Sequence, residues 1–262
     1  MRIAVIGAGW AGAAAAWQLQ QDGHHATVFE ASHTIGGRAR KHRSTPLQQL
    51  VDNGQHILLG AYSSTLALMQ ALQIDVETSF YRFDLNILSA DGSFQFKTAP
   101  LPAPFHLLGP LFSAKGVRIV DRLRLVQLQR YLIKQKWRTP SGMSVLELLQ
   151  HTQQPNVLIQ KLWHPLCIAA LNTPIETACA QLFANVLRDS LGGKRRDTQM
   201  LIPLRNMSDL WAQTALAQAD LRLGQTVRQL VKKDRHYHIH DEPFDGIIVA
   251  TNVPSAARLL QN

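Results

Sequence analysis

The first twelve residues, MRIAVIGAGWAG, constrain the fold more than any other stretch of the chain. The apolar run Arg2–Ile6 predicts a short buried strand, and Gly7, Gly9 and Gly12 follow it in the spacing G-x-G-x-x-G. In a strand–turn–helix unit the first glycine permits a tight turn and the second lets backbone approach a pyrophosphate. The third allows the helix to pack closely on the strand. The pattern therefore predicts a dinucleotide-binding α/β unit.

The residues after the glycines continue this unit. A helix predicted over Ala13–Gln21 would aim its N-terminal N–H groups at phosphates, and Gly23 would end it. Ala26–Phe29 predicts a second strand. Glu30 follows that strand, where a carboxylate can accept hydrogen bonds from ribose hydroxyls. Strand, glycines, helix, strand and acid in this order favour a nucleotide site over a turn that serves packing alone.

A second glycine motif narrows the choice of cofactor. The segment EASHTIGGRARKH places Gly36, Gly37 and Arg38 shortly after the acid. Backbone N–H groups and a guanidinium fork suit a diphosphate, although a basic surface turn would have the same composition. The segment resembles the FAD-binding fingerprint of the amine oxidase and carotenoid desaturase superfamily, where G-G-R follows the acid. FAD is therefore favoured over NAD.

The segment VDNGQHILLGAY, residues 51–62, places the polar residues Asn53, Gln55 and His56 between apolar ones. By itself, a histidine such as His56 is more often structural than catalytic. Together with VIGAGWAG, GGRAR and LWHPLCIAALNTPIETACAQLFANVLRDSLGG, however, the segment resembles one family. That family is the hydroxysqualene dehydroxylases, also described as squalene-associated FAD-dependent desaturases.

The resemblance implies a function. It indicates an FAD-dependent oxidoreductase that reductively removes the hydroxyl of hydroxysqualene, giving squalene, in squalene and hopanoid biosynthesis. The expected partners are a long-chain isoprenoid substrate and other enzymes of squalene synthesis. Gln55 and His56 are the candidate catalytic groups, and no metal site is expected. FAD contacts are expected at Gly7, Gly9, Trp10, Ala11, Gly12, Glu30, Gly36, Gly37, Arg38 and Val227, the last through a backbone contact to adenine.

Two alternatives remain open. One is another flavoenzyme of the superfamily, either a polyene desaturase or an amine oxidase. An amine oxidase would be expected to carry an aromatic cage in its C-terminal half, and none is apparent in this sequence. The other is a truncated, non-catalytic pseudo-flavoprotein that acts through partners.

The expected fold class is α/β: a Rossmann-like FAD-binding domain split by a largely helical substrate or cap insert. Residues 1–60 would form its first part, 61–216 the insert and 217–262 the return. In the return, strands are predicted over Val227–Val231 and Gly246–Ala250. Related flavoproteins continue with a further strand and a G-D motif that meets the ribityl and phosphate region of the flavin. None follows Ala250, so we expect an FAD domain that is incomplete at its C-terminus.

Three local patterns organise the insert. Ala61–Gln73 predicts a helix, and LNILSADGSFQFK predicts a hairpin with Asp91-Gly92 as a two-residue turn. Ser144 and Thr173 each stand three residues before a glutamate, which predicts two capping boxes that open helices.

The charge of the chain is uneven. Lys+Arg number 27 against 18 Asp+Glu, and residues 115–138 hold eight cationic side chains and a single carboxylate, Asp121. Apolar residues alternate with these charges at helical spacing. A solvated helix face, a membrane surface and nucleic acid would each suit such a helix. No nucleic-acid-binding motif is present, so we expect no nucleic-acid partner, and the implied isoprenoid substrate favours peripheral membrane contact.

Localisation follows from what the sequence lacks. No uninterrupted apolar run reaches the length of about 18 residues that a transmembrane helix needs. The glycines interrupt the N-terminal apolar stretch, which argues against a signal peptide. We therefore expect a cytoplasmic protein, with peripheral attachment to the inner face of the membrane as an option.

Overall fold

The N-terminal segment forms the predicted strand, turn and helix. In the computed structural model, which describes every residue except 55, 100–113, 192 and 262, β1 spans Arg2–Ile6 and β2 spans His25–Glu30. Helix α1 spans Trp10–Gln21, so it begins three residues earlier than predicted, because the glycine turn closes at Gly9, which is the N-cap residue. Gly23, with a φ of 77°, follows the helix end as expected.

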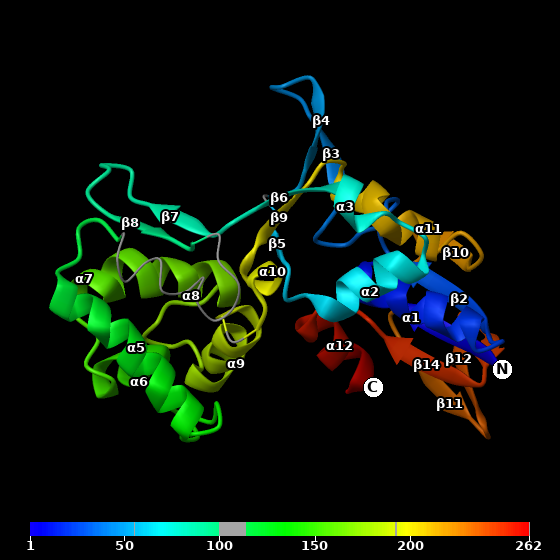
Figure 1. Cartoon of the computed structure of the whole chain (residues 1–262). Coiled ribbons are helices and arrows are strands. Elements are labelled where there is room, and N and C mark those ends of the chain that lie inside the picture. The colour runs from blue at the N-terminus through cyan, green and yellow to red at the C-terminus, as the bar shows by residue number, and fades with distance from the viewer. Residues whose placement is uncertain (55, 100–113, 192, 262) are drawn as a thin grey trace. The chain divides into compact units, whose positions relative to one another are not determined.

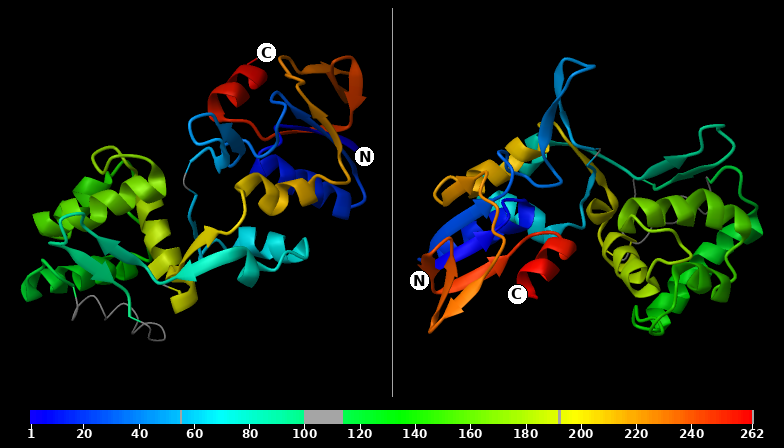
Figure 2. Two further views of the ribbon diagram at one scale, coloured as in Figure 1. Left: turned by 90° about the horizontal axis from the view of Figure 1, so that it is seen from above. Right: turned by 180° about the vertical axis from the view of Figure 1, so that it is seen from behind.

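The central sheet of the first unit is parallel and has the strand order β10-β2-β1-β14 (Figure 1). Strand β10 spans Asp220–Leu223 and pairs with β2, while β14 spans Gly246–Val249 and pairs with β1. The last part of the chain therefore returns to flank the first strands, as both views of Figure 2 show. The predicted α/β class and the strand predicted over residues 246–250 are confirmed.

The two faces of this sheet carry different elements. Helix α1 contacts β1, β2 and β14, and its small residues Gly12, Ala13 and Ala16 are buried. The other face receives Ala4 and Ile6, because side chains alternate along a strand. On this face an antiparallel sheet packs, formed by β11 (Val231–Lys233), β12 (His236–Ile239) and β13 (Glu242–Phe244).

The strand predicted over Val227–Val231 is wrong for most of its length. Only Val231 belongs to a strand, β11, and residues 225–230 have no regular structure. The side chain of Val227 instead packs into an apolar cluster with Phe29 and Phe244, 8% exposed. Burial, not strand pairing, explains the apolar character that suggested a strand there.

The chain divides into two compact units. The first comprises residues 1–57, 64–81 and 202–262, and the second comprises 58–63 and 82–201. Residues 64–81 and 202–216, predicted to belong to the insert, lie in the first unit, and residues 58–60, predicted to belong to the first part of the FAD domain, lie in the second. The remaining elements of the first unit are β3 (Lys41–Ser44), β4 (Gln49–Asp52), α2 (Ser63–Ala71), α3 (Val76–Ser79), β6 (Phe80–Phe83, at the boundary), the π-helix η3 (Ser208–Ala212), α11 (Gln213–Ala215) and α12 (Val253–Leu260).

The second unit is mainly helical. Its apolar core contains Trp163 and Phe183, whose rings meet edge to face with centroids 6.2 Å apart. The indole N–H of Trp163 donates to the side chain of Gln154 at 3.0 Å. The elements are β5 (Leu58–Leu59), β7 (Asn86–Leu88), β8 (Gln95–Lys97), α5 (Ile119–Lys134), α6 (Val145–His151), α7 (Asn156–Leu158), η2 (Ile159–Trp163), α8 (His164–Leu171), α9 (Ala180–Leu191), α10 (Arg195–Thr198) and β9 (Met200–Pro203, at the boundary).

Among the local predictions in the insert, the helix after Ala61 and the capping box at Ser144 are confirmed, as α2 and at the start of α6. The hairpin is also confirmed as β7 and β8, but its two-residue turn is wrong. Six residues, 89–94, separate the strands, because the Asp91 carboxylate accepts hydrogen bonds from the hydroxyl of Ser89 and the backbone N–H of Ser93. These bonds close a longer loop.

The second capping box is wrong. Residues 174–178 form a single turn, and α9 begins only at Ala180. The carbonyl groups of Ile175 and Ala178 accept hydrogen bonds from Leu146 and Val145 at the start of α6. Because of these hydrogen bonds, residues 174–178 do not continue into a helix. The Thr173 hydroxyl donates to the Leu171 carbonyl and does not cap a helix. Among the described helices, none is both long and apolar enough to cross a membrane.

Candidate functional site

The first glycine turn is so tight that side chains would not fit in it. Gly7 has a φ of 106°, and a Cβ there would lie 2.7 Å from the carbonyl oxygen of Ala250 in the loop after β14. A Cβ on Gly12 would lie 1.8 Å from the carbonyl oxygen of Gly7. Helix α1 therefore starts directly against the turn. The unpaired N–H groups of its first turn lie at the carboxyl end of the sheet.

The second glycine motif packs against the first. The N–H of Gly36 donates to the carbonyl of Ala8 at 2.9 Å, and Gly9 and Gly36 form a parallel bridge. Gly37 has a φ of 59°, and a Cβ there would lie 3.1 Å from the Cα of Gly9. The two loops thus meet backbone to backbone. Arg38 follows at an exposed position, and its side chain makes no hydrogen bond or ion pair within the described residues.

The carboxylate of Glu30 is held at the end of β2. One of its oxygens accepts from the N–H of Ala8 and the other from the N–H of Ser32, each at 2.8 Å. These two bonds fix the carboxylate beside the glycine turn and leave each oxygen a further lone pair. The position is the one expected for a ribose-binding acid.

A large cleft opens at this end of the sheet. Its volume is about 1370 Å³, more than the roughly 300–1,000 Å³ typical of small-ligand pockets. The predicted cofactor residues that line it are Gly7, Gly9, Trp10, Ala11, Glu30, Gly36, Gly37, Arg38 and Val227, together with the candidate catalytic residue His56. Gly12 instead packs behind the turn, and Gln55 lies outside the described residues.

Four arginines and one carboxylate, Glu30, give the cleft a net positive charge. Arg38, Arg40, Arg228 and Arg258 all line it, and the last three were not predicted from the sequence. Arg228 and Arg258 come from the return segment, so no local motif announces them. Arg258 lies near the end of α12, a helix that begins at the cleft with its N-cap Asn252 and its Ser255. Such a surplus of cations suits an anionic ligand such as a diphosphate.

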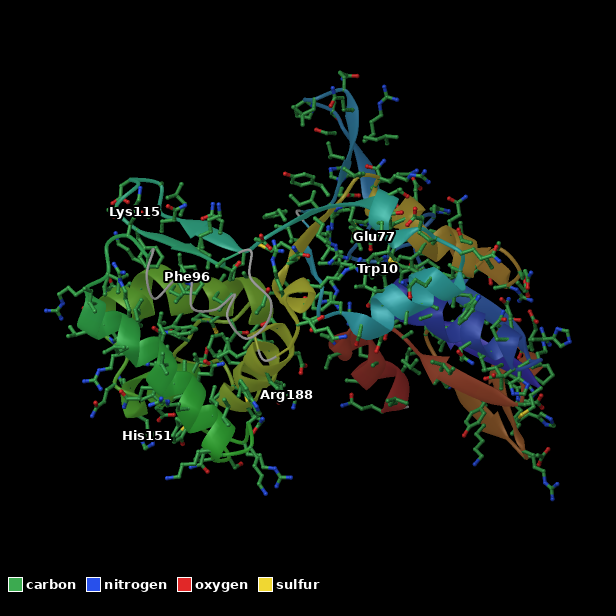
Figure 3. The ribbon with its side chains drawn as sticks, in the orientation of Figure 1. Trp10, Glu77, Phe96, Lys115, His151 and Arg188 are labelled. Atoms are coloured by element: carbon green, nitrogen blue, oxygen red, sulfur yellow. The ribbon has the colours of Figure 1, made fainter. Side chains whose placement is uncertain are left out.

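Two buried ring nitrogens in the cleft have no partner within the described residues. They are Nε1 of Trp10, at the start of α1 (Figure 3), and Nδ1 of His56. The Trp10 ring rests against Trp211, with centroids 5.0 Å apart. Because buried polar groups are normally hydrogen-bonded, each of these atoms is left without the partner that a polar group of a ligand would supply.

The strand pair β3–β4, which precedes His56, is bound to other parts of the first unit. Strands β3 and β4 form an antiparallel pair, and the Lys41 ammonium group binds the carboxylate of Asp209 at 2.6 Å. The carboxylate of Asp52 accepts from the N–H of Met207 at 2.9 Å. These contacts fix the residues that follow β4 relative to η3.

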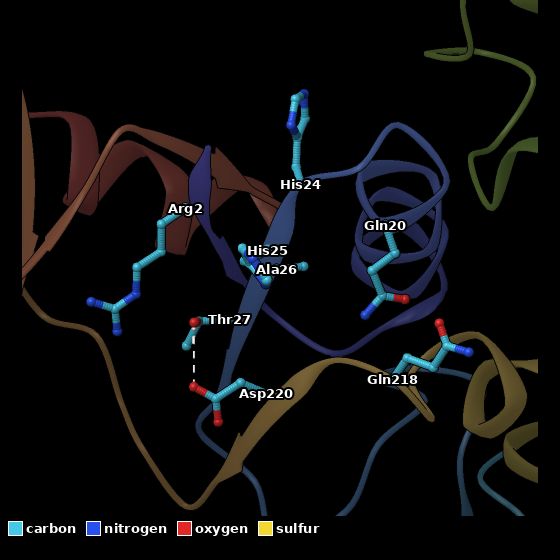
Figure 4. Close-up of a pocket in the computed structure, with 8 residues that line it drawn as sticks. All are labelled: Arg2, Gln20, His24, His25, Ala26, Thr27, Gln218 and Asp220. Carbon is cyan, nitrogen blue, oxygen red and sulfur yellow. Dashed lines mark hydrogen bonds between the residues drawn. The ribbon is translucent and has the colours of Figure 1, made fainter.

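A second cavity, of about 360 Å³, lies at the opposite, amino end of the strands (Figure 4). Arg2, His25 and Asp220, which begin β1, β2 and β10, line it, and the Thr27 hydroxyl meets the Asp220 carboxylate there at 3.3 Å. Ligands of open parallel sheets bind at the carboxyl ends of the strands. The larger cleft is therefore the candidate cofactor site.

Comparison with known proteins agrees with this geometry. Residues 10–262 match the family of flavin containing amine oxidoreductases. The chain belongs to this family. The cleft fits the flavin dinucleotide FAD, which carries two phosphates and polar groups along its length. It offers two glycine loops, a net positive charge, and two ring nitrogens that have no partner within the described residues.

Hydroxysqualene dehydroxylases are among the curated relatives. The one from Zymomonas mobilis is 30% identical over 197 residues, 72% of this chain and 44% of the relative. The one from Rhodopseudomonas palustris is 27% identical over 226 residues, 84% of this chain and 51% of the relative. The chain thus spans about half the length of these relatives.

Among solved structures, cyclohexylamine oxidase from Brevibacterium oxydans superposes with a TM-score of 0.69 at 17% identity. The match covers 98% of this chain and 59% of the oxidase. At this identity the likeness shows the fold. It confirms the α/β class predicted from the sequence.

Proposed function

We propose that the chain binds FAD in the large cleft and forms part of an oxidoreductase that reductively dehydroxylates hydroxysqualene to squalene. The observation that carries the cofactor assignment is the cleft itself, where two interlocked glycine loops, Glu30 and four arginines converge. The hydroxysqualene dehydroxylases among the relatives, at up to 30% identity, support the substrate.

Each part of the cleft would hold a different part of the cofactor. The first-turn N–H groups of α1 and the guanidinium of Arg38 would bind the diphosphate. The free lone pairs of the Glu30 carboxylate would accept hydrogen bonds from ribose hydroxyls. The backbone N–H and carbonyl of Val227 make no hydrogen bond within the described residues and would bind the adenine edge.

When bound in its reduced form, FAD supplies the hydride that replaces the hydroxyl of the substrate, which leaves with a proton as water. The protein would position the reactants and keep water out. His56 can donate or accept a hydrogen bond through its unpartnered Nδ1, and with Gln55 it would orient polar groups near the flavin or the leaving hydroxyl.

A long-chain isoprenoid partitions into membranes. We therefore include peripheral contact with the inner face of the membrane and association with other squalene-synthesis enzymes in the proposal. A polyene desaturase or amine oxidase activity on the same cleft would use the same cofactor contacts. Assays on the three substrate classes distinguish these reactions.

The visible absorption spectrum of the purified chain tests the cofactor first. We expect bound flavin, or flavin binding on titration with FAD. A chain that stays colourless after incubation with excess FAD and removal of free flavin contradicts the cofactor proposal. The flavin-loaded chain is then incubated with hydroxysqualene and a reductant, and squalene formation is measured. If the chain converts a polyene or an amine and not hydroxysqualene, the proposed substrate is wrong and the proposed cofactor still holds.

A further inference from the structure

The solvent-facing side of helix α5, in the second unit, carries a row of large apolar side chains. Ile119, Val120, Leu123 and Ile133 are 73%, 62%, 60% and 54% exposed. Side chains of this size are usually buried, and several exposed on one element mark a candidate interaction surface.

Helical geometry places three of these four residues on one face, with Val120 at its edge. At about 3.6 residues per turn, Ile119, Leu123 and Ile133 fall within about 100° of one another around the axis. The buried residues of the helix, Leu128 and Leu132, lie on the opposite side and pack into the core of the second unit. The exposed row is therefore a second apolar face in addition to the one that anchors the helix.

Two cations share this outer face. Arg130 and Lys134 fall within the same sector as Ile119 and Leu123. Both are exposed, and neither makes a side-chain hydrogen bond or ion pair within the described residues. They are free to meet an external anion.

Two other cations at the start of the helix bind groups of the protein itself. Arg118 binds Asp121 at 2.7 Å, which keeps the pKa of that carboxyl below its usual range. Arg122 donates to the carbonyls of Val117 and Ala114. Part of the positive charge of residues 115–138 is therefore paired within the protein, whereas Arg130 and Lys134 remain unpaired within the described residues on the face that carries the apolar row.

We propose that this outer face of α5, formed by Ile119, Val120, Leu123, Arg130, Ile133 and Lys134, docks on an anionic lipid bilayer. Apolar side chains would enter the interface while the arginine and lysine meet lipid phosphates, as in helices that lie in the plane of a membrane. The opposite charge of the lipid selects this occupant, since a purely apolar partner would leave both cations desolvated and unpaired. The inference deepens the membrane contact included in the proposed function and rests on that part of it; it uses residues of the second unit alone and does not depend on FAD binding.

Vesicle binding by the full 262-residue chain tests the proposal. Co-sedimentation is measured with phosphatidylcholine vesicles and with vesicles containing about 30% phosphatidylglycerol, at low and high salt. We expect binding to the anionic vesicles, weakened by salt. Arg130→Gln with Lys134→Gln should weaken that binding about 30-fold, and Ile119→Ser with Leu123→Ser at least tenfold.

Matched controls lie on other faces of the same unit. Leu88→Ser removes a leucine that is 59% exposed on β7, and Arg188→Gln removes an exposed arginine of α9 that is paired with Asp189 (Figure 3). Both should bind within about twofold of the wild type, since neither changes the outer face of α5. Circular dichroism checks that all variants remain folded.

Three results overturn the proposal. The first is a wild-type chain that does not bind anionic vesicles, and the second is a pair of α5 variants that bind as the controls do. The third is evidence that the outer face of α5 binds another partner. In that case the α5 variants would change self-association or binding to a duplex oligonucleotide and leave vesicle binding intact. Flavin content is measured on the same samples, so loss of membrane binding and loss of cofactor are recognised separately.

Discussion

Replacing Glu30 with glutamine tests the cofactor site most directly, because the substitution removes charge with little change of shape. The wild-type carboxylate accepts from the N–H of Ala8 and the N–H of Ser32, each at 2.8 Å. A glutamine side chain offers a single oxygen, so its NH₂ group must face one of these donors. One backbone N–H then loses its acceptor, which costs about 1–3 kcal/mol in the free energy of unfolding of the flavin-free chain.

The same substitution weakens FAD binding for a separate reason. Hydrogen bonds from ribose hydroxyls to a carboxylate are charge-assisted and contribute about 1.5–3 kcal/mol. Their loss should raise the Kd for FAD roughly 10- to 100-fold. Urea unfolding of the flavin-free chain gives the first quantity, and titration with FAD followed by flavin fluorescence gives the second.

Glu176→Gln is the matched control for both measurements, because Glu176 is exposed in the second unit and the change in charge is identical. We expect it to leave the Kd for FAD within about twofold of the wild type. The reasoning is refuted if Glu30→Gln lowers the stability of the flavin-free chain but binds FAD as tightly as Glu176→Gln. The carboxylate would then serve only to hold the loop.

Three further predictions concern packing, pH and thiol chemistry. Gly12→Ala should abolish flavin binding and lower the Tm, because its Cβ would lie 1.8 Å from a carbonyl oxygen of the turn; an unchanged visible spectrum and melting curve would contradict this. Hydrogen bonds, first from Arg222, lower the pKa of Glu242 from 4.5 to about 2. Because the folded-state pKa is depressed, this stabilisation is present above about pH 5 and is lost as the pH falls towards 2. Glu242→Gln should therefore cost about 1 kcal/mol at pH 7, allowing for solvent screening, and urea unfolding should show the difference from wild type disappear in acid. Cys179 is exposed, whereas Cys167 is buried and burial raises the pKa of its thiol, so a thiol reagent should modify one cysteine rapidly and the second only on unfolding.

The cofactor-binding turn could be predicted from the sequence because its constraints are local. Gly7 and Gly12 are required by contacts within a few residues of the strand and helix that they join, together with the loop that carries Ala250. Glu30 ends the adjacent strand at a distance fixed by the length of one helix. Spacing along the chain therefore carries nearly all the information needed to place these residues.

Arg228 and Arg258 could not be predicted in this way. They reach the cleft only because β10 pairs with β2 and β14 pairs with β1, and the residues thus brought together are separated by most of the chain. The failed capping box at Thr173 has a similar cause. Its pattern is complete in the sequence, but hydrogen bonds to the start of α6 hold the segment in a single turn. Tertiary pairing overrides a local preference worth only about 1 kcal/mol.

The distribution of charge connects the two proposals. The four arginines and Glu30 of the cleft carry a net charge of +3 and residues 115–138 a net charge of +7, so the remaining residues together carry −1. The net charge of +9 is therefore concentrated in two regions and does not describe a uniformly basic surface. One set of cations surrounds a cleft lined by glycine backbone, which suits a small dianion. In the other region, Arg130 and Lys134 lie on the same face of α5 as exposed isoleucine and leucine, which suits an extended anionic surface with an apolar interior. The residues around each group of cations, more than the number of cations, indicate whether the group binds the phosphates of a cofactor or those of lipids.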